Sequence, residues 1–258
     1  NDNVSIFTGD GDGTFTAATP ATVTVGDQPF SVVVGFFNAD ADPDLAVANA
    51  NNDDVSILLG AAGATFTAGA DVPVGDEPRS VTVGDFNNDG NQDIATANFG
   101  SDNISIRFGN GAGAFAITTT FALTSGDDPI FVVAADFNND GFDDLAVANF
   151  STDEVAILIN DGTAPPTGTD YTRTDLPSGN DFEPTSIAVG NIDNDSSLQL
   201  QMTSPTQQTV SPFQGTVDSS TVAQGTEESS TVAQGTGGDL SALEKIEKLK
   251  KQWLELLP

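Results

Sequence analysis

The chain has 258 residues and a formal net charge of −31, because 38 acidic side chains stand against 7 basic ones. This charge disfavours nucleic acid as a partner and predicts self-repulsion that bound cations would relieve, although an acidic surface adapted to solubility or salty surroundings also explains it. Cysteine and histidine are absent, which excludes disulfides, zinc–thiolate sites and the usual general bases. No apolar run of about 18 residues occurs, so no membrane span is expected.

The first predicted element is an alternating apolar segment at residues 3–9, which is typical of a half-buried strand. Asp10 and Asp12 follow it in a glycine-rich stretch, but their counterparts are Ala61 and Gly63 in one later copy and Asn110 and Ala112 in another. A hairpin turn is therefore favoured over a metal site here. Related strand segments return at 55–60, 104–109 and 155–160.

A second type of strand follows a turn with the pattern Gly-Asp-x-Pro, which begins at Gly26, Gly75 and Gly126 and has a looser version at 179–184. The runs after these turns are short and rich in β-branched residues, which indicates strands. They occupy residues 31–34, 80–83, 131–134 and 186–189.

Each of these strands leads into an acidic loop. In the two full copies, Gly-Asp-Phe-Asn-Asn-Asp-Gly-x-x-Asp begins at Gly84, and its relative begins at Ala135. Oxygen-bearing side chains at loop positions 1, 3, 5 and 9, with glycine at position 6, are typical of calcium loops. The predicted ligands are Asp85, Asn87, Asp89, the Asn91 carbonyl and Asp93 for one Ca²⁺, and Asp136, Asn138, Asp140, the Phe142 carbonyl and Asp144 for another.

Two weaker copies flank the full ones. In the first, Phe36 and Ala41 depart from the pattern, and Asn38, Asp40, Asp42 and Asp44 remain as candidate ligands. In the last, Asp193 and Asp195 remain, but Ser196 replaces the glycine and Gln199 the final aspartate. An Asn/Asp-Gly turn without metal is the alternative for every copy.

The loops begin at residues 36, 85, 136 and 191, so the repeat is roughly 50 residues long and contains four strands. This organisation predicts an all-β fold, a β-propeller of four-stranded blades, over residues 1–204. Strands between residues 3 and 25 would complete the blade that residues 186–203 begin, closing a ring. A segment of a larger array, or assembly with another chain, is the alternative.

After residue 204 the composition changes. Residues 205–238 are polar and repetitive, with no lysine or arginine, and are expected to form a low-complexity linker. Residues 239–258 carry apolar side chains at helical spacing and predict an amphipathic helix. This helix would pack on its own chain, dock to a partner chain or self-associate, and the abrupt change also fits an appended segment.

The repeated motifs Gly-Asp-Phe-Asn-Asn-Asp-Gly, Leu-Ala-Val-Ala-Asn and Val-Ser-Ile-Leu-Leu-Gly resemble the FG-GAP (VCBS-type) repeats of integrin-α-like calcium β-propellers, over residues 1–204. The resemblance implies structural Ca²⁺ in the loop between the first two strands of a blade. It also implies an extracellular or secreted setting, with a role in cell adhesion or carbohydrate binding.

The leading hypothesis is thus a non-enzymatic, calcium-stabilised extracellular module that binds glycan or protein ligands. A structural or assembly subunit, whose helix at 239–258 docks to a partner chain, is the alternative. An accessory domain of a secreted enzyme is the third hypothesis.

Overall fold

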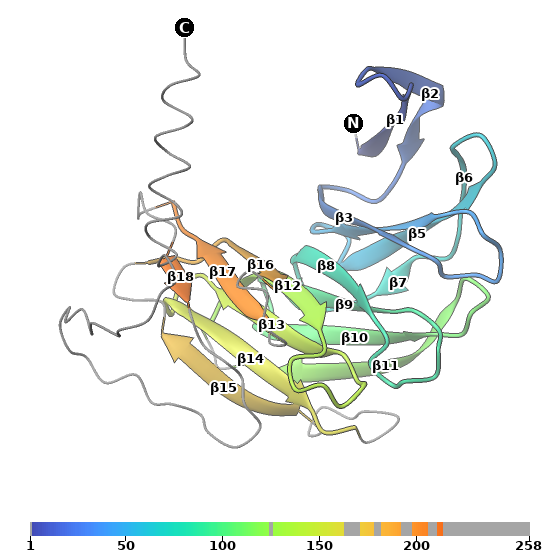
Figure 1. Ribbon diagram of the computed structural model, residues 1–258. Coiled ribbons are helices and arrows are strands. Elements are labelled where there is room, and N and C mark those ends of the chain that lie inside the picture. Colours follow the sequence, from blue (N-terminus) through green and yellow to red (C-terminus); the bar gives the residue numbers. More distant parts are fainter. Residues whose placement is uncertain are drawn as a thin grey trace, which may run out of the picture. The chain divides into compact units, whose positions relative to one another are not determined.

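The computed structural model describes residues 2–123, 126–162, 171–177, 182–191, 198–205 and 211–213. These residues form antiparallel sheets of consecutive strands, as Figure 1 shows. The predicted helix at 239–258 lies outside the described residues. In the described part of the chain, no helix is long and apolar enough to cross a membrane.

Three sheets are complete blades of a β-propeller, which confirms the predicted fold class. The first contains β3 (Pro29–Gly35), β4 (Asp44–Asn49), β5 (Asp54–Ala61) and β6 (Thr65–Ala68), with β7 (Val72–Pro73) also pairing with β5. The second contains β8 (Pro78–Gly84), β9 (Asp93–Asn98), β10 (Asn103–Gly109) and β11 (Phe115–Ala122). The third contains β12 (Pro129–Ala135), β13 (Asp144–Asn149), β14 (Glu154–Asn160) and β15 (Tyr171–Pro177).

Two further sheets are incomplete. Strands β1 (Asn3–Gly9) and β2 (Phe15–Thr24) form a two-stranded sheet, and β16 (Ser186–Gly190), β17 (Gln199–Thr203) and β18 (Ser211–Phe213) form a three-stranded one. The expectation that these halves join into one blade is therefore wrong for the described residues, because β18 occupies the edge of β17 that β1 would need. Strand β18 also lies within the predicted linker, so strand pairing continues beyond residue 204.

The hairpin between β1 and β2 is the predicted turn. Gly11 and Gly13 have φ values of 81° and 94°, a left-handed conformation that glycine adopts without strain. The Asp12 carboxylate accepts a hydrogen bond from the Thr14 N–H at 2.9 Å, and Asp10 accepts bonds from threonine hydroxyls. Both acids thus serve the turn itself.

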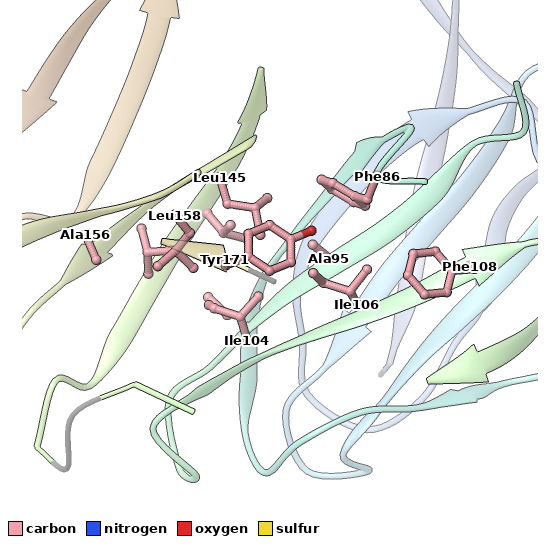
Figure 2. Packing of buried hydrophobic residues seen from close by; sticks show 12 residues of the cluster. Phe86, Ala95, Ile104, Ile106, Phe108, Leu145, Ala156, Leu158 and Tyr171 are labelled. Carbon is pink, nitrogen blue, oxygen red and sulfur yellow. The ribbon is translucent and has the colours of Figure 1, made fainter. Parts of the chain in front are cut away.

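The core lies between neighbouring sheets, because the second strand of a blade is buried on both faces. In β13, Leu145 and Val147 pack toward the second blade, whereas Ala146 and Ala148 pack toward β16 and β17. Figure 2 shows the cluster between the second and third blades, where Phe86 and Ile106 meet Leu145 and Tyr171. This two-sided burial explains why the Leu-Ala-Val-Ala segments contain no polar residue between their ends.

A buried polar network joins the second and third strands at the other end of the blade from the acidic loops. The Asn98 amide donates to Asn103 Oδ1 at 2.7 Å and to Ser105 Oγ at 2.9 Å. Ser105 Oγ in turn accepts the N–H of Gly75, which opens the Gly-Asp-x-Pro turn. Asn49, Ser56 and Gly26 repeat this arrangement in the first blade.

In the third blade, Ala156 occupies the position of this serine. The Asn149 side chain is fully buried there, and neither its Oδ1 nor its Nδ2 has a partner within the described chain. The Gly126 N–H of the turn donates instead to Asp102 Oδ2 at 2.9 Å, and an ion pair of 2.7 Å joins Asp127 of the turn to Arg173. An unpaired buried amide costs roughly 1–3 kcal/mol, so this blade carries an energetic defect.

We predict that Ala156→Ser stabilises the protein by about 1 kcal/mol, because the new hydroxyl would accept the hydrogen bond that Asn149 offers. The corresponding change Ser105→Ala should destabilise it by about 1–3 kcal/mol, since it removes the hydroxyl that accepts both the Gly75 N–H and one hydrogen bond of the Asn98 amide. Urea denaturation of both variants is the measurement. If Ala156→Ser lowered the free energy of unfolding, the interpretation of Asn149 as an unpaired amide would be contradicted.

Candidate metal loops

The loop between β8 and β9 folds around its own side-chain oxygens. The Asp85 carboxylate accepts the N–H groups of Asp89 and Gly90 at 3.1 and 2.9 Å. Asn87 Oδ1 accepts the Asp89 N–H at 3.0 Å, and Asp89 Oδ1 accepts the Asn91 N–H at 2.8 Å. Short polar side chains that bond the backbone two residues on form Asx turns, so the odd positions turn together toward one side of the loop.

The loop between β12 and β13 repeats these contacts. The Asp136 carboxylate accepts the N–H groups of Asp140 and Gly141 at 3.2 and 2.9 Å. Asn138 Oδ1 accepts from Asp140, and Asp140 Oδ1 accepts the Phe142 N–H, both at 2.9 Å. The two copies that the sequence predicts to be complete therefore share one conformation.

Left-handed residues allow this conformation. Asn88 and Gly90 have φ values of 53° and 84°, and Asn139 and Gly141 have 60° and 93°. Asparagine and glycine are the residues that tolerate such values best. In the first loop, Ala39 and Ala41 occupy the same positions, and neither is among the described residues with positive φ. The first loop therefore follows a different path.

The last aspartate of each loop is fully buried at the start of the second strand. Asp93 Oδ2 accepts the Phe86 N–H at 3.0 Å and Asp93 Oδ1 accepts the Gly109 N–H at 2.8 Å. Asp144 makes the same pair of bonds, with Phe137 at 2.9 Å and Asn160 at 2.8 Å. One carboxylate thus ties the loop to the end of the third strand.

This burial raises the pKa of both the Asp93 and the Asp144 carboxyl to about 7. The two backbone N–H groups that bond each carboxylate lower its pKa, whereas the neighbouring loop aspartates, Asp85 and Asp89 or Asp136 and Asp140, raise it further. The loop aspartates are therefore close enough to repel the buried one.

The donor types in both full loops suit calcium, which prefers six to eight oxygen ligands. Within the described ranges, however, no three acidic side chains are gathered into a group that could hold a metal ion. One reason is visible in the second loop, where Asp89 Oδ2 accepts a hydrogen bond from the Asn87 amide at 3.0 Å. For Asp89 Oδ2 to bind an ion, its hydrogen bond with the Asn87 amide would have to break. The Asx turns that shape the loop would stay intact.

The two weaker loops differ. In the first, Asn38 bonds the Asp40 N–H, Asp40 bonds the Asp42 N–H, and Asp44 is buried on the N–H groups of Phe37 and Gly60. Position 1 is Phe36, so the oxygen that Asp85 supplies elsewhere is lacking. Asp193 and Asp195 lie outside the described residues.

Comparison with protein-family models identifies the family of this chain. A sequence model of the FG-GAP-like repeat matches residues 37–96, 85–147 and 136–200, which together cover more than half of the chain. The chain belongs to the FG-GAP-like repeat family. None of the curated proteins compared matches it.

Solved structures with similar folds include BBS1N in complex with ARL6DN, in crystals soaked with lead or mercury, and a protein from Lactobacillus plantarum. The lead-soaked BBS1N has 15% sequence identity and a TM-score of 0.47, with 74% of this chain and 58% of that chain covered. For mercury-soaked BBS1N the identity is 14%, the TM-score 0.47 and the coverages 74% and 59%. The Lactobacillus plantarum protein has 18% sequence identity and a TM-score of 0.48, with 75% of this chain and 59% of that chain covered. The chain thus spans less than two thirds of the length of these chains.

Contacts between successive FG-GAP-like repeats are a feature that sequence reasoning missed. Gln92, at loop position 8 of the second repeat, accepts the Phe36 N–H of the first repeat at 2.6 Å. Asp143 does the same one repeat later, accepting the Asp85 N–H at 2.8 Å. Leu198 holds this position in the fourth repeat and cannot accept such a bond. Comparing position 8 across the repeats would have signalled this role.

A second contact between repeats lies at the Gly-Asp-x-Pro turns. Asp53 accepts the Glu77 N–H of the next repeat at 3.0 Å, and both residues have positive φ, 58° and 49°. The backbone is strained at such positions in residues other than glycine, so the bond stabilises an unfavourable conformation. Equivalent bonds join Asp2 to Gln28, Asp102 to Asp128 and Asp153 to Glu183. The 49–51 residue spacing of these aspartates was the available signal.

We predict that protein kept in EGTA loses stability as pH rises from about 4 to 7. Asp93 and Asp144 have pKa values of about 7 in the folded state, against about 4 in an unfolded chain. The folded state therefore binds more protons in this window, so the free energy of unfolding falls with rising pH, by on the order of a few kcal/mol. Chemical denaturation at a series of pH values measures the slope.

Two double variants test whether the buried aspartates cause this slope, one that removes them and a control that removes charge elsewhere. Asp93→Asn with Asp144→Asn should flatten the slope, even though each amide nitrogen would face a backbone N–H and lower the overall stability. Asp76→Asn with Glu77→Gln removes two exposed charges and should leave the slope in place. An unchanged slope in the first variant would show that the buried aspartates do not cause it.

Proposed function

We propose that this protein is a calcium-stabilised, extracellular binding module whose propeller recognises glycan or protein ligands. The FG-GAP-like family and the propeller fold suggest a binding or adhesion-type module, and such families are typically non-enzymatic. The observation that carries the calcium proposal is the pair of full loops, which share the same ligand types and the same hydrogen bonds.

Each full loop would hold one ion. The side chains that would bind it are Asp85, Asn87, Asp89 and Asp93 in one loop, and Asp136, Asn138, Asp140 and Asp144 in the other. Calcium would supply positive charge and no chemistry beyond it. The buried Asp93 would then sit beside a cation as well as beside Asp85 and Asp89, which favours its charged form. Binding to the folded state alone adds stability by linkage.

We predict that calcium raises the melting temperature and that EGTA lowers it, because three carboxylates in each loop repel one another without an ion. At a calcium concentration of 100 times Kd, each site adds about 2.7 kcal/mol. Asp85→Asn with Asp89→Asn should remove one bound ion in native mass spectrometry and reduce the calcium-dependent shift. Asp136→Asn with Asp140→Asn should do the same for the other loop.

The matched control is again Asp76→Asn with Glu77→Gln, which alters net charge equally but lies away from the loops. It should retain both ions and the full shift. Equal melting temperatures in calcium and in EGTA would refute the proposal. So would a calcium effect that both double loop variants preserve.

For the ligand, we predict that binding depends on intact loops, since they stabilise the propeller that presents it. A glycan array and an array of extracellular proteins, each probed in calcium and in EGTA, test this. Signals lost in EGTA and lost in the Asp85→Asn with Asp89→Asn variant would support a calcium-dependent binding module. Binding that persists unchanged in EGTA would separate ligand recognition from calcium.

A further inference from the structure

The two full acidic loops are in direct contact with each other. Asp143, at position 8 of the loop between β12 and β13, lies against Asp85, at position 1 of the loop between β8 and β9. Asp143 Oδ2 accepts the Asp85 N–H at 2.8 Å, and the Asp143 N–H donates to the Asp85 carbonyl at 3.4 Å. A single residue of one loop thus holds both backbone polar groups of Asp85 in the other.

Asp143 is flanked by two predicted ligands of its own loop. The Phe142 carbonyl precedes it at position 7, and the Asp144 carboxylate follows it at position 9. An ion that fixed these two groups would also fix the residue between them, and with it the backbone of Asp85, the predicted first ligand of the other ion. Residues 142–144 therefore serve both loops.

Asn160 makes a second link between the loops, from the end of β14. It is fully buried, and its Nδ2 donates to the Phe86 carbonyl at 2.8 Å and to the Asp143 carbonyl at 3.3 Å. Its backbone N–H donates to Asp144 Oδ1 at 2.8 Å. One residue hence binds the chain directly after Asp85 and the last two residues of the neighbouring loop.

The Asn160 link is specific to the pair of full loops. The residues in its place in the first and second blades are Gly60 and Gly109, which have no side chain. A Cβ at Gly109 would lie only 2.1 Å from the Gln92 carbonyl oxygen, so the chain there passes too close for any side chain. Among the three complete blades, this bridge therefore occurs only where two full acidic loops are neighbours.

The residue before loop position 1 is also fitted to the contact. A Cβ at Gly84 would lie 2.9 Å from Asp143 Oδ2, closer than Cβ atoms approach an oxygen. Ala135 takes this place in the next loop, and the position-8 residue of the repeat that follows is Leu198, which has no acceptor. Glycine thus stands where the side chain of the neighbouring loop must approach the backbone.

We propose that Asp143 and Asn160 couple the two calcium loops, so that an ion in one loop raises the affinity of the other loop for calcium. This inference rests on the calcium proposal above. A loop must rearrange to take up its ion, because the Asn87 amide bonds Asp89 Oδ2. Shared residues that a first ion has already ordered do not have to be ordered again for the second. By linkage, the coupling acts equally in both directions.

Repulsion between the two ions acts against this coupling. The tips of both loops, residues 88–90 and 139–141, are exposed, so water and dissolved salt screen the repulsion. The links through Asp143 and Asn160 are direct hydrogen bonds between partly or fully buried groups, which screening weakens less. The structure therefore favours positive coupling.

Calcium titration calorimetry of the full chain tests the coupling. The Kd of each loop alone comes from two variants, Asp136→Asn with Asp140→Asn and Asp85→Asn with Asp89→Asn. The coupling factor is the product of these two constants divided by the product of the two stepwise constants of the unsubstituted chain. We expect a factor of about 5 or more.

Two neutral substitutions at position 143 separate the hydrogen bond from the charge. Asp143→Gln keeps an acceptor, as Gln92 does one repeat earlier, and should retain the coupling. Asp143→Leu copies Leu198 and should lower the coupling factor severalfold. Asn160→Gly, which copies Gly109, removes the second link and should lower the factor as well.

A purely structural role would lower the melting temperature of these variants and leave the coupling factor unchanged. Equal factors in Asp143→Gln and Asp143→Leu, or a factor of about 1 or less in the unsubstituted chain, would overturn the inference and leave both calcium sites in place. Asn160→Gly gives the same comparison with the unsubstituted chain if Asp143→Leu does not fold. If neither loop bound calcium in the unsubstituted chain, the calcium proposal itself would fail, and the coupling with it.

Discussion

A buried aspartate at the start of the second strand is the interaction on which each of the three complete blades depends. Asp44, Asp93 and Asp144 are fully buried, and each accepts one N–H from the loop and one from the end of the third strand. A charged group in the protein interior is costly unless it is paired and hydrogen-bonded. These two bonds satisfy the carboxylate and hold three consecutive chain segments together. Their geometry brings the loop carboxylates close to a buried charge.

This constraint links stability to charge in an unusually acidic chain. The backbone N–H groups favour the charged form of Asp93, whereas burial and the nearby Asp85 and Asp89 oppose it. The resulting high pKa marks an electrostatic conflict, which either a proton or a cation would relieve. The calcium proposal follows from this conflict as much as from the spacing of the loop residues.

Successive blades are joined at both ends as well as through their apolar faces. Gln92 and Asp143 connect neighbouring acidic loops, and the aspartates from Asp2 to Asp153 connect the opposite turns. Each joint pairs a backbone N–H of one repeat with a side chain of its neighbour, so the repeats stack in a fixed register. In repeat proteins of this kind, stability is approximately a sum of repeat and interface contributions.

The repeat, the strands and the acidic loops could be predicted from the amino-acid sequence alone. These features depend on residues close together in the chain: alternation in the strands, glycine at the left-handed positions 90 and 141, and oxygen at every second loop position. Family membership followed from the same local patterns.

Contacts between residues far apart in the chain, such as pairs separated by 26 or 56 residues, became visible only in the folded structure. The pairing of Asp102 with Asp128, the bond from Phe36 to Gln92 and the defect at Asn149 each depend on how one sheet sits against another or on what stands opposite a buried amide. The separation of β1–β2 from β16–β17 belongs here as well. A local sequence pattern shows that the strands of both partial blades exist. Which strands pair depends on which strand occupies the open edge of a sheet, and in this chain β18 occupies the edge of β17.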